Sequence, residues 1–133
     1  MTNFDGLRAE HAAAYGYGLI LPLADSTINA ACRRMLEQHR SLSDRAQLLW
    51  PDAPPAEAGY STSEPLETSW DALIFAVRLE SDACEGWASQ LAAEDQTEQQ
   101  RAFAADALEK ATVQMARWRN IIPGAPFSPL PGL

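Results

Sequence analysis

Three titratable side chains interrupt stripes of otherwise apolar residues: Glu10, His39 and Glu80. At 100° per residue, each lies within about 40° of the centre of the apolar stripe of its predicted helix. An ionised carboxylate that is buried alone is costly, so we expect these side chains to have polar partners. Carboxylate oxygens and imidazole nitrogens can hydrogen-bond to one another, or they can bind a metal ion.

The spacing of the apolar residues predicts the helices that position this group. The first two helices are expected over about residues 4–21 and 26–50. The third is expected to begin between Glu64 and Trp70, and the fourth to end near Asn120. Asp95–Glu98 resembles a capping box that opens the last of them. The stripe of the second helix is regular and consists of Ile28, Cys32, Met35, His39, Leu42, Ala46 and Leu49. Such alternating steps of four and three describe a packing seam in an all-α protein.

The heights of the three polar residues predict how the helices are connected. Counted from the end where the first two helices meet, Glu10 and His39 lie about twelve and thirteen residues down, so they are level. Glu80 lies at the same height as both if the third helix starts at that same end of the bundle. The linker 51–63 can span about 40 Å, enough to run the length of a helix of about 36 Å. The sequence therefore predicts a four-helix bundle in which a long crossover makes the second and third helices parallel.

Composition limits the classes of protein and of partner. The 133 residues fit one domain, which we divide into a bundle over 1–122 and a Pro-rich, extended arm over 123–133. A net charge of −8 argues against nucleic acid or an anionic membrane as the main partner. The longest uncharged run, 12–24, is shorter than the roughly 20 residues of a membrane-spanning helix. The N-terminal residues show no signal-peptide pattern, so we expect a cytoplasmic protein.

Other reactive groups give weaker signals. Cys32 and Cys84 should differ in height by about 18 Å, too far for a disulfide, and we expect both to be packed in the core. Motifs of catalytic nucleophiles and of phosphate-binding loops are absent from the sequence. The arginines at 33–34 and at 117 and 119 are interpreted as solvated or salt-bridged surfaces, with anion binding as the alternative.

Several of these residues also carry a resemblance to a known family. The segment Glu10–Gly18 (EHAAAYGYG), the pair His39-Arg40, the segment Ala116–Arg119 and the Pro-rich end resemble a ferritin-like family of bacterial proteins with unassigned function. The resemblance covers nearly the whole chain. It implies a ferritin-like four-helix bundle and no established reaction.

The residues depart from the pattern of di-iron carboxylate bundles. Those bundles take a Glu from each of two helices and a Glu-x-x-His from each of the other two. Leu36 stands where a Glu should precede His39, and the fourth helix contains no His. Glu10, His39 and Glu80 remain as candidate ligands, with His11 possible beside them. We expect a hydrogen-bonded polar cluster, joined by Tyr15 or Tyr17, with no cofactor; iron or manganese is the alternative.

Two classes of function follow. The first is a non-catalytic bundle with a degenerate metal site, which acts through its surface as a homodimer and has no catalytic or cofactor-binding residues. The second is a metal-binding, ferritin-like oxidoreductase that uses Glu10, His39 and Glu80. The dimer is expected because Met115, Trp118, Ile121 and Ile122 are more than one helical stripe can bury, and the interface would include the fourth helix or the arm. An arm folded back on its own bundle is the alternative to that dimer.

Overall fold

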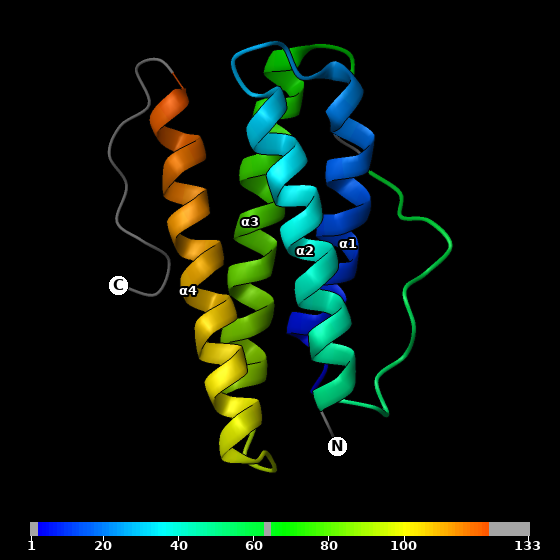
Figure 1. The fold of residues 1–133 in the computed structure, drawn as a ribbon, viewed down its shortest axis with the longest axis vertical. Coiled ribbons are helices and arrows are strands. Elements are labelled where there is room, and N and C mark those ends of the chain that lie inside the picture. Colours follow the sequence, from blue (N-terminus) through cyan, green and yellow to red (C-terminus); the bar gives the residue numbers. More distant parts are fainter. Residues whose placement is uncertain (1–2, 63–64, 123–133) are drawn as a thin grey trace.

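The computed structural model describes residues 3–62 and 65–122, and this part of the chain is helical with no strand. Its four long helices are α1 (Asp5–Ile20), α2 (Asn29–Leu49), α3 (Ser69–Leu91) and α4 (Glu98–Ile121), and a short 3-10 helix, η1 (Leu21–Leu23), follows α1 (Figure 1). The predicted all-α bundle is therefore confirmed. The proposed arm, 123–133, lies outside the described residues. None of the described helices is both long enough and apolar enough to cross a bilayer.

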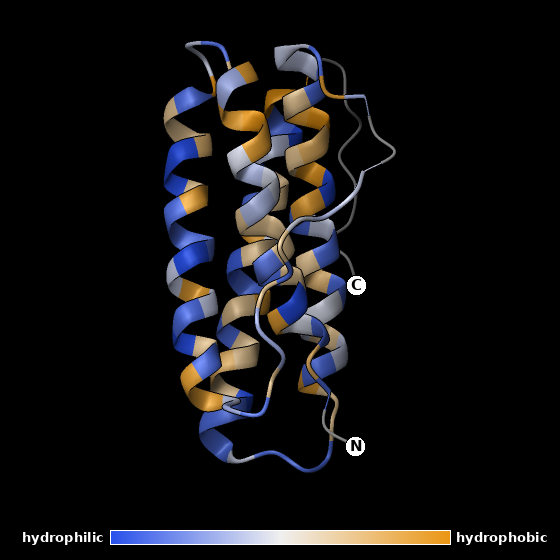
Figure 2. Ribbon diagram, turned by 90° about the vertical axis from the view of Figure 1, so that its right-hand side faces the viewer, coloured by the Kyte–Doolittle hydropathy of each residue, from blue (hydrophilic) through white to orange (hydrophobic). Residues whose placement is uncertain are grey.

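The helices run in the predicted directions. The backbone N–H of Asp25, in the turn after η1, donates to Ser69 Oγ at 3.1 Å, so α3 starts at the end where α1 finishes. At the opposite end Gln100 Nε2 donates to the carbonyl of Leu49 at 2.8 Å, joining the start of α4 to the end of α2. Therefore α2 and α3 are parallel, and the chain between them returns along the outside of the bundle (Figures 1 and 2).

Packing between the helices is uneven. α1 packs closely on α2 and α3, and α3 on α4, whereas α2 and α4 barely touch. Three glycines allow the close approach of α1 and α3. A Cβ at Gly86 would lie 2.6 Å from the carbonyl oxygen of Asp5, one at Gly16 would lie 2.7 Å from Leu79, and one at Gly6 would overlap the ring of Trp87. Gly16 therefore serves the contact between the helices, while a Cβ at Gly18 would meet open space.

Capping differs in detail from the sequence-based expectation. The capping box of α4 is formed by Thr97 and Gln100, not by Asp95 and Glu98. Thr97 Oγ1 accepts from the N–H of Gln100 at 3.0 Å, and Gln100 Oε1 accepts from the N–H of Thr97 at 2.9 Å. A threonine followed three residues later by a glutamine satisfies the same rule two residues further along the chain.

The apolar core has two halves, and each of the four helices contributes buried residues to both. One half contains Tyr17, Ile20, Leu73 and Trp118, and the other contains Leu7, Trp50, Trp87 and Met115. In α1 the half that contains Leu7 comes first, and in α2 and α3 the half that contains Tyr17 comes first. The polar residues Glu10, His39 and Glu80 lie between the halves.

Candidate functional site

The three polar residues predicted from the sequence meet in the middle of the bundle. Glu10 comes from α1, His39 from α2 and Glu80 from α3, and each is at most 1% exposed. His39 Nδ1 bonds to Glu10 Oε2, and His39 Nε2 lies 2.8 Å from Glu80 Oε2. Because an ionised carboxylate only accepts hydrogen bonds, both ring nitrogens donate, which is the pattern of an imidazolium. The heights computed from the helical rise therefore placed these residues correctly.

Three aromatic side chains extend this cluster to the fourth helix. Trp87 Nε1 donates to Glu10 Oε1 at 2.8 Å, the hydroxyl of Tyr17 donates to Glu80 Oε2, and Trp118 Nε1 donates to the Tyr17 hydroxyl oxygen at 2.8 Å. Trp118 belongs to α4, so one chain of hydrogen bonds joins all four helices. We call these six residues the polar network: Glu10, Tyr17, His39, Glu80, Trp87 and Trp118.

The two indoles were not identified as site residues from the sequence. Trp118 was expected among the excess apolar residues of the fourth helix, and no hydrogen bond was predicted for Trp87. The available signal is that a buried indole N–H needs an acceptor, and inward carboxylates provide one. Of the two tyrosines proposed as links, Tyr17 joins the network. Tyr15 instead packs against Tyr60, with ring centroids 5.4 Å apart.

The surroundings of His39 favour its charged form. Burial by itself lowers the pKa of His39, but the charges of Glu10 and Glu80 and the hydrogen bonds they accept raise the pKa, to about 10. The ring of Tyr17 stacks on the imidazole of His39, with the two ring centroids 5.4 Å apart. Burial raises the pKa of Tyr17 well above its usual value, and the charge of Glu80 raises it further. At neutral pH, Tyr17 is therefore a neutral donor and His39 a cation.

The arrangement does not fit a di-iron centre. Both nitrogens of His39 carry hydrogens directed at carboxylates, so neither offers a lone pair to a metal. No group of three or more His, Cys, Asp or Glu within the described residues is placed so that it could hold a metal ion. His11 lies outside the polar network and lines a hollow under the crossover. One oxygen of the network, Glu80 Oε1, is buried without a hydrogen-bond partner among the described residues.

The cysteines are buried and unbridged, as predicted. Burial raises the pKa of Cys32 to about 11, and burial is also the main cause that raises the pKa of Cys84. Both are therefore thiols at neutral pH and lack the thiolate form that nucleophilic chemistry needs.

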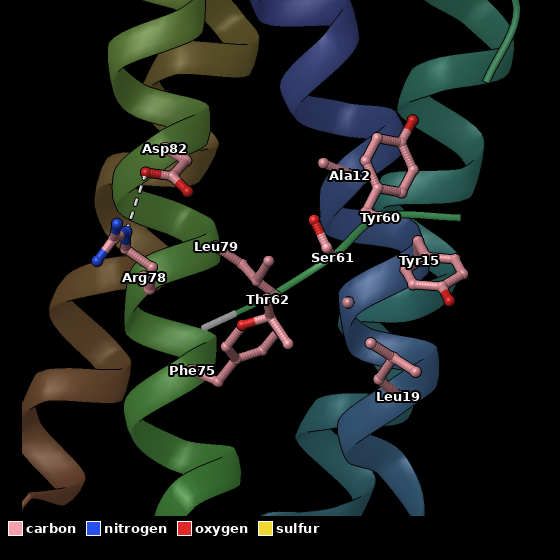
Figure 3. Close-up of a pocket in the computed structure, with 11 residues that line it drawn as sticks. Ala12, Tyr15, Leu19, Tyr60, Ser61, Thr62, Phe75, Arg78, Leu79 and Asp82 are labelled. Atoms are coloured by element: carbon pink, nitrogen blue, oxygen red, sulfur yellow. Dashed lines mark ion pairs between the residues drawn. The ribbon is translucent and has the colours of Figure 1, made fainter. Parts of the chain in front are cut away.

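A separate pocket lies on the surface between α1, α3 and the crossover (Figure 3). Its volume is about 230 Å³. Tyr60, Ser61 and Thr62 reach it from the crossover, and an ion pair between Arg78 and Asp82 of 3.4 Å lies at its edge. No pattern in the sequence predicts this pocket, since it exists only because the crossover returns over α1. No member of the polar network lines it.

Comparison with known proteins gives a relative but no activity. The chain is similar to a conserved hypothetical protein of Mycobacterium tuberculosis, rv2844, known from a crystal structure. The two are 32% identical, the match covers 89% of this chain and 92% of that one, and the TM-score is 0.81. No curated protein matches the chain significantly. A family model described as a domain of unknown function (DUF4439) matches residues 3–133. The chain therefore belongs to the DUF4439 family.

Proposed function

We propose that this protein is a non-catalytic bundle whose polar network holds the four helices together, and that it acts through its surface. The observation that carries the proposal is that the network satisfies all of its own hydrogen-bond donors, with Glu80 Oε1 as an acceptor left without a partner among the described residues. Each imidazole, indole and phenol hydrogen is donated to an acceptor within the network, and its members are at most 1% exposed. A group that serves catalysis must reach a substrate, directly or through one water.

The surface hollows support the same interpretation. Four hollows between described residues have linings that do not include Glu10, His39 or Glu80. The carboxylates and the imidazole that a ferritin-like oxidoreductase would need as ligands are present, but they hydrogen-bond to one another. The network is thus a degenerate metal site that has become a structural element of the core.

The metal content of the purified protein tests this proposal. We expect the chain, isolated without chelators, to contain no stoichiometric iron or manganese by elemental analysis, because His39 has no free lone pair. The matched control is Glu80→Gln, which removes a candidate ligand and keeps the side-chain volume. Stoichiometric metal that is lost in Glu80→Gln would instead support the metal-binding oxidoreductase.

We further propose that the protein is a homodimer. Of the residues expected at the interface, Met115 and Trp118 are fully buried in their own chain and cannot contribute, whereas Ile121 is 40% exposed. Support now comes from Trp70, which is 51% exposed, and from Ile74, one turn further along α3 and 37% exposed. A large aromatic side chain left in water is typical of the centre of an interface.

Sedimentation at micromolar concentration tests the dimer. We expect twice the chain mass of 14.5 kDa, and we expect Trp70→Ser to shift the equilibrium to the monomer, since the exposed indole would be the main buried anchor. Val113→Ser, on the outer face of α4, is the control and should remain dimeric. A wild-type monomer would refute the proposal.

A further inference from the structure

Three arginines line one surface hollow between α2 and α4. Arg33 and Arg34 come from the second turn of α2, and Arg117 comes from near the end of α4. These two helix ends lie at the same end of the bundle, at the top of Figure 1. The hollow has a volume of about 850 Å³, and it exists because α2 and α4 make little direct contact.

The charges in this hollow are not neutralised. Arg34 and Arg117 have no carboxylate partner in the described part of the chain, and the partner of Arg33 is the neutral amide oxygen of Asn29, at 3.4 Å. One acid, Glu37, also lines the hollow, and it pairs with Arg40 at 3.6 Å. Elsewhere Lys110 pairs with Asp106, and the chain has an excess of acidic residues.

The start of α2 adds no negative charge beside these arginines. α2 has no acidic residue in its first turn and no side-chain cap, and two arginines follow in the next turn. An acid is favoured at a helix N-terminus, yet none stands there, so no carboxylate of this turn opposes an anion that binds the arginines.

We propose that this hollow binds an organic phosphate. One guanidinium group can donate two parallel hydrogen bonds to two oxygens of a phosphate. Three guanidinium groups therefore suit a ligand with more than one negative charge. Gln38 adds an amide donor at the wall, while Ala30 and the buried Met35 give an apolar floor for the organic part. The volume lies within the range of small-molecule sites, about 300–1,000 Å³, and suits a ligand the size of a nucleotide. This site is independent of the polar network.

Calorimetric titration of the full chain tests the site with adenosine triphosphate and with pyrophosphate. We expect both to bind saturably, and Arg34→Gln combined with Arg117→Gln to weaken each Kd at least tenfold. The matched control, Arg8→Gln combined with Arg101→Gln, removes two positive charges elsewhere and should leave each Kd within twofold.

Each other outcome overturns the proposal. Equal loss in both double variants would show only general attraction by net charge. Pyrophosphate binding without binding of the nucleotide would remove the organic part of the ligand, and tighter binding of an acidic peptide would assign the surface to a protein partner. As a check on folding, the unliganded Arg34/Arg117 variant should melt no lower than wild type, because like charges are removed. A lower midpoint would show that these arginines serve packing.

Discussion

Replacing His39 with leucine is expected to lower the free energy of unfolding by about 3–5 kcal/mol. Leucine supplies enough apolar volume to avoid a large cavity, so the loss arises from charge. Glu10 and Glu80 both bond to His39, and the substitution leaves two buried carboxylates facing each other without the cation. Urea unfolding at pH 7, followed by circular dichroism, measures the change.

A triple variant separates charge from shape. Glu10→Gln, His39→Leu and Glu80→Gln together remove all the ionisable groups of the central cluster and keep acceptors for Trp87 and Tyr17. We expect this variant to be more stable than His39→Leu alone, since exchanging a whole buried charge cluster for neutral groups is often nearly neutral. A cost below about 1 kcal/mol for His39→Leu would contradict a charged imidazole at this position.

Alkaline pH is expected to weaken the fold through the same residue. The pKa of His39 is about 10 in the folded chain against an ordinary value of 6.5. Because the folded state holds this proton more tightly, the stabilisation is complete below about pH 6.5 and is lost as the pH rises through 10. The slope approaches about 1.4 kcal/mol per pH unit, or about 2–3 kcal/mol between pH 7 and pH 9.

Urea titrations at several pH values between 6 and 9 measure this slope. The triple variant is the control, because it lacks His39 and both carboxylates of the network, and we expect its stability to change little over the same range. If wild type and the triple variant showed equal slopes, the alkaline loss would belong to other groups.

The sequence predicted the helices and the central cluster because both depend on regular geometry. A fixed rise per residue was sufficient to place Glu10 and His39 at one height, and the length of the linker then placed Glu80 beside them. The choice between Tyr15 and Tyr17 could not be made in this way. Two residues apart on a helix, they point to different sides, and the rotation of α1 against α3 is set by its contacts at Gly16 and Gly86.

The aromatic hydrogen bonds depend on information that a single helix does not contain. The direction of an indole N–H follows from side-chain torsions, and those of Trp87 and Trp118 are fixed by neighbours on other helices. The surface sites have the same origin. The pocket beside Tyr60 depends on the path of the crossover, and the arginine hollow depends on the separation of α2 and α4.

The order in which the chain can fold follows from the sequence distances within the polar network. Its hydrogen bonds join residues from 29 positions apart, for His39 and Glu10, to 101 positions apart, for Trp118 and Tyr17. No pair of adjacent helices can complete the network. Each charged side chain stays hydrated until its hydrogen-bond partners are in place. Dehydration of the network must therefore coincide with docking of the whole bundle, so that partly assembled chains gain little and the protein folds and unfolds as one cooperative unit.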